Sequence, residues 1–191
     1  MKLNVWRALA FLLLIALSIG FGFGFDAVAT AIERHSYPCP EEYAEPIREM
    51  SERYALPEPV LWGFLHNASR FESNAVHGDA IGLMQLTPAQ FSYIRKNLLG
   101  EESAESGLLY DPSTNLNAGC AYLSHLYQRY GVWDLTFAAY CVGADTVDAW
   151  LTDPELTDSR GALIEIPDIE VREYVEGVER MIEQYRTLYF K

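Results

Sequence analysis

Apolar residues recur every three to four positions through most of this chain, which is the period of an α-helix with one buried face. The pattern is clearest after Pro59, where positions 60, 61, 64, 65 and 68 are Val, Leu, Phe, Leu and Ala. A second apolar stripe runs through residues 169–188. We expect a buried helix at the first stripe and a surface helix docked on the core at the second.

Capping residues predict where further helices begin and end. Thr87, Asp111 and Asp134 each stand just before a run of helix-forming residues, and Gly131 follows the second of these runs. A short helix is expected before Pro57. No segment shows a convincing strand pattern, so the expected fold class is all-α. The helices predicted in this way cover residues 47–55, 88–98, 112–130 and 135–142.

The N-terminal segment is typical of export. Lys2 and Arg7 precede an uncharged apolar run over residues 8–25, a length between that of a cleavable signal peptide and that of a membrane span. Residues 1–29 are therefore either a signal peptide or a membrane anchor, and both alternatives stay open. The basic residues keep this end in the cytoplasm, so the rest of the chain is expected outside it, either secreted or anchored. Residues 30–46, with three prolines, read as a tether to a domain over 47–191.

Composition excludes several classes of protein. The 191 residues carry 14 Lys and Arg against 27 Asp and Glu, a formal net charge of −13, so nucleic acid is not an expected partner. Half of the residues are hydrophobic, which excludes a disordered chain and suits one compact core.

Cysteine and histidine spacing gives no sign of a metal site or a cofactor. Cys39, Cys120 and Cys141 form no C-x-x-C pair, and the four histidines lack the spacing of known ligand motifs. We therefore expect neither. Cys120 and Cys141 lie in apolar segments, where a buried free thiol and a disulfide are both possible.

Five sequence blocks carry a resemblance to a known family, and the first two of them lie together in residues 66–88. They are HNASRFESNAVHGDAIGLMQLTP at 66–88, a block with Asn117, Gly119, Tyr122 and Leu123, AAYCVG at 138–143, and PDIEVREYV at 167–175. In this order they resemble the lytic transglycosylases of the soluble (SLT) type, over about residues 52–187. The resemblance implies a single helical domain with a goose-type lysozyme-like fold.

The resemblance also implies an activity. Enzymes of this family cleave the MurNAc-GlcNAc β-1,4 bond of peptidoglycan and form 1,6-anhydro products without a cofactor, and one glutamate serves as acid and then as base. The implied partner is the peptidoglycan glycan strand. A cell-envelope protein is a further possible partner, as is the membrane if the N-terminal segment stays uncleaved.

Ala68 occupies the position of that glutamate. Ser69, Phe71, Ala75 and Val76 all match the family spacing, which fixes the alignment around it. A methyl group transfers no proton, and loss of general acid catalysis costs about 10² to 10⁴ in rate. An inactive or strongly impaired peptidoglycan-binding or scaffold protein is therefore expected. Three alternatives stay open: an active enzyme with Glu72 or another acid, an introduced Glu→Ala substitution in such an enzyme, and an interaction module that no longer binds glycan.

Seven further positions are implied to bind the glycan. His77 stands where the family has serine and Cys141 where it has asparagine, so the floor of the groove is changed. Buried tyrosines hydrogen-bonded to the backbone are also common in helical cores, so a scaffold role is the alternative for the two tyrosines. The implied set is Ser69, His77, Met84, Gln85, Tyr140, Cys141 and Tyr174.

Overall fold

The computed structural model describes residues 28–30, 32–101 and 105–190, which belong to two compact units, residues 1–38 and Cys39–Lys191. In the first unit, residues 28–30 and 32–36 are helical. The apolar run predicted as a signal peptide or anchor lies outside the described residues. Within the described ranges, no helix has the length and apolar character of a membrane span.

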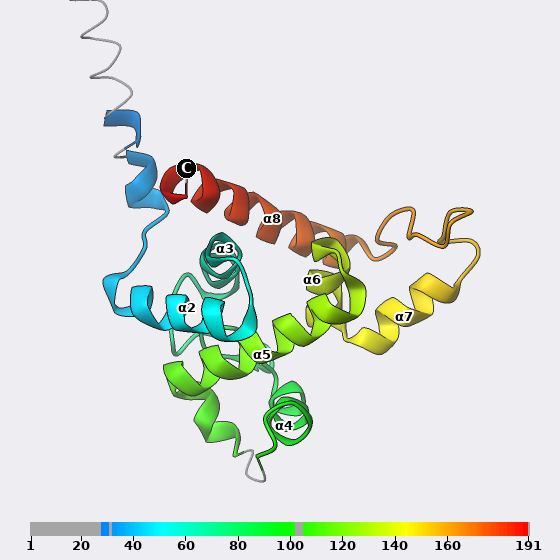
Figure 1. Cartoon of the computed structure of the whole chain (residues 1–191), viewed down its shortest axis with the longest axis horizontal. Helices are drawn as coiled ribbons and strands as arrows, with labels where there is room; N and C mark the ends of the chain where they lie inside the picture. The colour runs from blue at the N-terminus through cyan, green and yellow to red at the C-terminus, as the bar shows by residue number, and fades with distance from the viewer. Residues whose placement is uncertain (1–27, 31, 102–104, 191) are drawn as a thin grey trace, which may run out of the picture. The chain divides into compact units, whose positions relative to one another are not determined.

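The second unit is built from helices, as predicted (Figure 1). Helix α5 crosses its middle and contacts α2, α4 and α6, while α3 packs against α8. The elements are α2 (Glu41–Tyr54), α3 (Glu58–Ser69), β1 (Val76–His77), β2 (Ala80–Ile81), α4 (Pro88–Asn97), the 3-10 helix η1 (Ser106–Tyr110), α5 (Pro112–Tyr130), α6 (Trp133–Val142), α7 (Ala144–Thr152) and α8 (Ile169–Tyr189).

Three features differ from the predicted elements. A small antiparallel hairpin pairs Val76 with Ile81, and its strands of two residues are too short to show an alternating pattern. Helix α7 follows α6 directly, with Gly143 as the only residue between them. Asp134 does not cap α6, because the helix begins one residue earlier, at Trp133.

Helix α2 begins before the predicted start of the domain. We expected a helix from residue 47 after a tether over 30–46, but α2 starts at Glu41 and continues through Pro46. Glu41 and Glu42 in its first turn favour a helix N-terminus, because they face the positive end of the helix dipole. Ile47 and Met50 are buried, so the packing of α2 offsets the hydrogen bond that Pro46 cannot donate.

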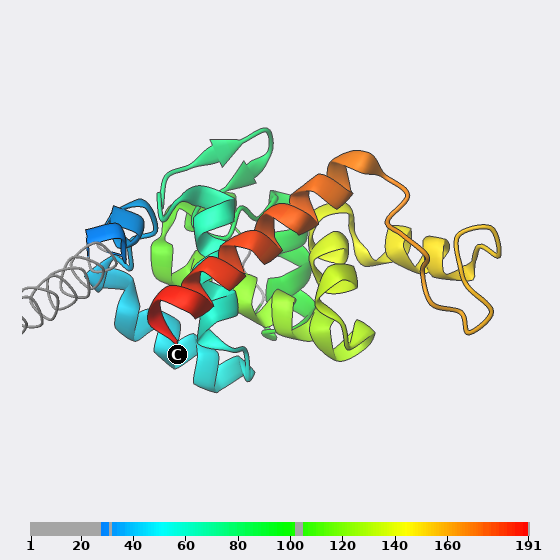
Figure 2. The ribbon, with the colours of Figure 1, turned by 90° about the horizontal axis from the view of Figure 1, so that it is seen from above.

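The core is formed where α8 lies across α3 (Figure 2). Most of α3 is buried, including Leu61, Phe64 and Leu65, each with no exposed surface. Asp168 caps α8, because its carboxylate accepts hydrogen bonds from the backbone N–H groups of Glu170 and Val171 at 2.9 and 3.2 Å. The apolar stripe of α8 packs against α3. This packing brings Tyr174 near the end of α3, where Ala68 lies.

Candidate functional site

One pocket of about 340 Å³ collects most of the residues predicted to form the site. We call it the Ala68 pocket. None of its lining residues is Asp, Glu, Lys or Arg. Six of the predicted positions line it, namely Ala68, His77, Gln85, Tyr140, Cys141 and Tyr174, and they are joined by Asn67, Ala80, Thr87 and Gln90.

Ala68 lies in the last turn of α3, one residue before the helix ends at Ser69. It is half-buried and contributes a methyl group to the wall of the pocket. A side chain at this position reaches into a space surrounded by uncharged groups. A carboxyl group here would be desolvated, which favours its protonated form, as a general acid requires.

Glu72 is outside the pocket. Arg70 and Phe71 adopt left-handed backbone conformations, with φ of 51° and 66°, and these end α3. Phe71 turns inward and packs against Trp62 with ring centroids 5.6 Å apart. Glu72 is therefore exposed, in a turn beyond the helix, and does not share a helical face with Ala68.

Ser69 and Met84 also lie outside the lining of the pocket. The Ser69 hydroxyl is buried and donates to the Leu65 carbonyl at 3.3 Å. Met84 has no exposed surface and packs on α5 at Gly119, where an added Cβ would lie 2.5 Å from the Met84 Cβ. Both residues support the site from the core.

Asn115 holds the loop that carries Gln85. Its amide donates to the carbonyls of Ile81 and Leu109 at 2.8 and 2.9 Å, and its Oδ1 accepts from the Met84 N–H at 2.7 Å. The sequence comparison assigns the asparagine of this block to Asn117. The side chain of Asn117 instead accepts hydrogen bonds from α2, so Asn115, four residues before Gly119, is the one that fixes the loop.

Tyr140 belongs both to the pocket and to its scaffold. It is 3% exposed, and its hydroxyl donates to the Met84 carbonyl at 2.9 Å. Its own carbonyl accepts from the Gln90 amide at 2.8 Å. Gln90 also closes a capping box with Thr87 at the start of α4. Sequence reasoning found the Thr87 cap but missed Gln90, although the T-x-x-Q spacing of the capping box was present in the sequence.

Cys141 lines the pocket as an exposed thiol, whereas Cys120 is buried, and neither forms a disulfide. The expectation of a buried thiol is therefore correct for Cys120 and wrong for Cys141. Partial desolvation in the pocket, followed by the charge of Asp168, raises the pKa of the Cys141 thiol. Burial also raises the pKa of the Tyr174 phenol, with a smaller contribution from Cys141. Both groups therefore stay uncharged near neutral pH.

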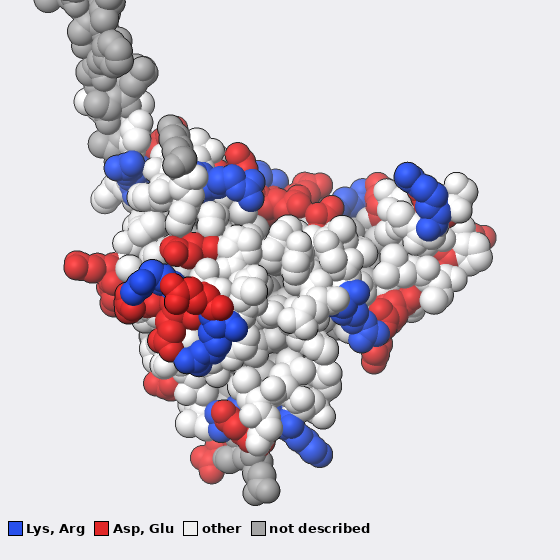
Figure 3. Space-filling view, viewed as in Figure 1, with Lys and Arg blue, Asp and Glu red and all other residues white. Residues whose placement is uncertain are grey.

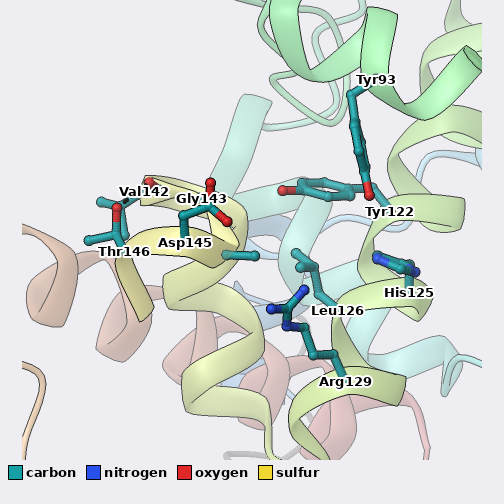
Figure 4. Close-up of a pocket in the computed structure, with 10 residues that line it drawn as sticks. Tyr93, Tyr122, His125, Leu126, Arg129, Val142, Gly143, Asp145 and Thr146 are labelled. Atoms are coloured by element: carbon teal, nitrogen blue, oxygen red, sulfur yellow. Dashed lines mark hydrogen bonds between the residues drawn. The ribbon is translucent and has the colours of Figure 1, made fainter. Parts of the chain in front are cut away.

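A second pocket, of about 400 Å³, lies on the other side of the end of α6 (Figure 4). We call it the Tyr122 pocket. It is lined by Tyr93 from α4 and by His125 and Arg129 from α5. Val142 and Gly143 form the opposite wall. Cys141 and Val142 are consecutive, so the end of α6 contributes to both pockets.

The acidic surplus of the chain is unevenly placed. Acidic and arginine side chains gather over α2, whereas the middle of the same face, over α5 and α6, is uncharged (Figure 3). In the described part of the chain, no group of three His, Cys, Asp or Glu side chains is arranged to hold a metal ion. The chemistry that the Ala68 pocket offers is therefore hydrogen bonding and shape, together with the imidazole of His77.

Comparison with known proteins identifies related sequences. A model of the family described as the transglycosylase SLT domain matches residues 45–160. The chain is 34% identical over 107 residues to the membrane-bound lytic murein transglycosylase C of Yersinia enterocolitica, covering 53% of this chain and 29% of that protein. It is 35% identical over 109 residues to the soluble lytic murein transglycosylase of Escherichia coli K12, covering 56% and 17%. The chain thus spans less than a third of the length of these relatives.

Solved structures show the same fold. The 70 kDa soluble lytic transglycosylase of Escherichia coli superposes with a TM-score of 0.72 at 25% identity, over 83% of this chain and 26% of that one. The lytic transglycosylase Slt of Pseudomonas aeruginosa, solved as an inactive mutant, gives 0.65 at 26% identity, over 80% and 25%. The Escherichia coli protein has also been solved with bulgecin A.

Proposed function

This chain belongs to the transglycosylase SLT domain family, and on that premise we propose that it binds the glycan strands of murein in the Ala68 pocket without cleaving them, or cleaves them only very slowly. The proposed role is that of a peptidoglycan-binding or scaffold protein.

The observation that carries this proposal is the composition of the pocket wall. Ala68 lines the pocket, and no Asp or Glu side chain joins it there. Departure of a sugar requires a proton on the glycosidic oxygen, and a carboxylic acid normally supplies it. With a methyl group in its place, general acid catalysis is lost, which reduces the rate by about 10² to 10⁴.

Binding does not need that carboxyl group. Gln85, Gln90 and Asn67 line the pocket with amide groups, and Tyr140 and Tyr174 contribute aromatic surface. Pockets that bind small molecules combine such apolar surface with a few placed polar groups. The Tyr122 pocket is a separate pocket on the other side of the end of α6 and shares no lining residue with the Ala68 pocket.

The alternative is an active lytic transglycosylase in which Glu72 or another acid replaces the missing one. The exposure of Glu72 beyond the end of α3 disfavours it, because a catalytic group must be held to within about 0.5 Å of its working position. An introduced Glu→Ala substitution in such an enzyme would give the same pocket.

We also propose that the folded unit lies outside the cytoplasm, where murein is found. The names of the relatives describe murein transglycosylases, one membrane-bound and one soluble, which supports that location. Whether the chain is anchored there or secreted depends on residues 1–29, as the sequence pattern indicated.

Sedimentation with insoluble murein tests the binding half of the proposal. We expect the chain to sediment with murein and Cys141→Trp to lose at least about tenfold in affinity, because an indole fills the pocket. Ala149→Trp is the matched control, since it adds the same side chain to an exposed position on α7 outside the Ala68 pocket. Unchanged binding by Cys141→Trp, or an equal loss in both variants, would refute the assignment of this pocket.

A further inference from the structure

His77 has a defined place in the Ala68 pocket. It ends strand β1, its side chain is exposed, and it lines the pocket together with Ala68. Its Nδ1 lies 2.9 Å from Oε1 of Gln85. Because Asn115 fixes the loop that carries Gln85, this pair rests on a rigid support.

The hydrogen bonds of Gln85 determine which nitrogen of His77 carries a proton. The Gln85 Nε2 donates to two backbone carbonyls, of Ala75 at 3.0 Å and of Gly82 at 2.7 Å. Carbonyls only accept, so Oε1 is the atom that faces the imidazole, and Nδ1–H of His77 must donate to it. The other ring nitrogen, Nε2, hydrogen-bonds no group in the described part of the chain. It accepts a hydrogen bond when the ring is neutral and donates one when the ring is protonated.

His77 is the one lining residue of the Ala68 pocket able to carry a positive charge. The other titratable lining groups are the phenols of Tyr140 and Tyr174 and the Cys141 thiol, whose pKa values burial raises, so they stay neutral. On the hairpin itself, Asp79 lies two residues away, in the turn between the strands. The pocket is therefore free of negative charge on a chain whose formal net charge is −13.

We propose that the Ala68 pocket recognises a carboxylate on the sugar, and that protonated His77 pairs with it through Nε2–H. A charge-assisted hydrogen bond from imidazolium to carboxylate is among the stronger ones in proteins. The proposal rests on the function proposed above and names its substrate class, which is glycan whose N-acetylmuramic acid carboxylates are free of peptide.

The test is a calorimetric comparison of three ligands with the full chain, at about pH 5.5 and about pH 8, on either side of the range in which histidine titrates. The ligands are a peptide-free GlcNAc-MurNAc tetrasaccharide, the same tetrasaccharide with its stem peptides, and neutral chitotetraose. We expect the peptide-free acidic ligand to bind about fivefold or more tightly at the lower pH. The affinities for the other two should change less than about twofold.

Three variants assign the effect to its residue. His77→Gln should abolish the gain at low pH, while His35→Gln, a change of the same kind at an exposed histidine outside both pockets, should keep it. Asp79→Asn should also keep it, and a loss there would assign the effect to Asp79 and overturn the proposal.

The outcomes separate this inference from the function on which it depends. If all three ligands bind without a pH effect, the carboxylate proposal is wrong and glycan binding stands. If the peptide-bearing ligand shows the gain at low pH, the carboxylate recognised belongs to the peptide, and the proposal is again wrong. If none of the three binds, the proposed function itself fails. As a second readout, NMR at about pH 5.5 should show the His77 ring signals shifting when the acidic tetrasaccharide is added and staying in place when chitotetraose is added.

Discussion

Gly63 and Ile182 bring the backbones of α3 and α8 into direct contact. A Cβ added at Gly63 would lie 2.5 Å from both Cα and N of Ile182, which leaves no room for any side chain at position 63. Farther along the same pair of helices, Gly177 faces Asn67, whose Oδ1 would lie 3.0 Å from an added Cβ. This close approach sets how near α8, with Tyr174, comes to the end of α3, with Ala68.

Gly63→Ala should therefore be strongly destabilising. The atoms that a new Cβ would meet are backbone atoms of α8, so the two helices must separate, at a cost of about 3 kcal/mol. Chemical denaturation measures this change in the free energy of unfolding. Gly107→Ala is the matched control, since nothing lies within 4 Å of its added Cβ, and it should change stability by less than about 1 kcal/mol. Equal effects of the two substitutions would show that α3 and α8 are not in backbone contact.

Tyr140→Phe removes the hydroxyl that satisfies the Met84 carbonyl. Because the site is buried, the carbonyl is left without a partner, and we expect a loss of about 1 to 3 kcal/mol in unfolding free energy. Tyr110→Phe, at a tyrosine that is 49% exposed, should have little effect. The affinity of Tyr140→Phe for murein should stay close to that of the unmodified chain, although its free energy of unfolding falls. The reason is that the hydroxyl points to the backbone and not to the ligand. A large loss of affinity for murein with an unchanged free energy of unfolding would show that the hydroxyl contacts the ligand and not the Met84 carbonyl.

Much of the site could be predicted because its residues belong to short blocks with fixed spacing. The glycine and glutamine of the GLMQ block and the position of Ala68 at the end of a helix need only local sequence to be recognised. Glu72, four positions after Ala68, would share its helical face only if α3 continued, but two consecutive left-handed residues end the helix first. No strong signal for that turn exists in the sequence, since Arg70 and Phe71 are not residues that favour positive φ.

Contacts between distant segments were harder to predict. Asn115 is fully buried, and its amide hydrogen-bonds three backbone groups, of Ile81 in β2, Met84 in the GLMQ block and Leu109 in η1, a set of partners that exists only after folding. Gln90 reaches the Tyr140 carbonyl across 50 positions of sequence. Residues 41–46 read as a tether because of their charges and Pro46, and it is burial of Ile47 and Met50 that makes them helical.

Glu179 on α8 gives the folded unit a pH-dependent stability. Burial, followed by the hydrogen bond and the charge of Asp134, raises its pKa from 4.5 to about 7. The folded state therefore holds this proton more tightly than the unfolded chain. Its stabilising contribution is complete below pH 4.5 and is lost as the pH rises through about 7. Glu179→Gln, which mimics the protonated form, should raise Tm at about pH 8 and should have a much smaller effect at about pH 4.5.

The control for that prediction is Glu173→Gln. Glu173 is exposed on the same helix, and the substitution changes the net charge by the same amount. It should shift Tm little and similarly at both pH values. If the two substitutions show the same pH dependence, the effect comes from net charge and not from the pairing of Glu179 with Asp134.

Product analysis tests the central claim most directly. The full chain and its Ala68→Glu variant are incubated with purified murein, and the soluble fraction is searched by mass spectrometry for 1,6-anhydro muropeptides. We expect none from the unmodified chain above a buffer blank, and clear release by Ala68→Glu, because the substitution supplies the acid that the pocket lacks. Release by the unmodified chain would contradict the proposal that it does not cleave murein. No release by Ala68→Glu would show that the pocket has lost more than one side chain.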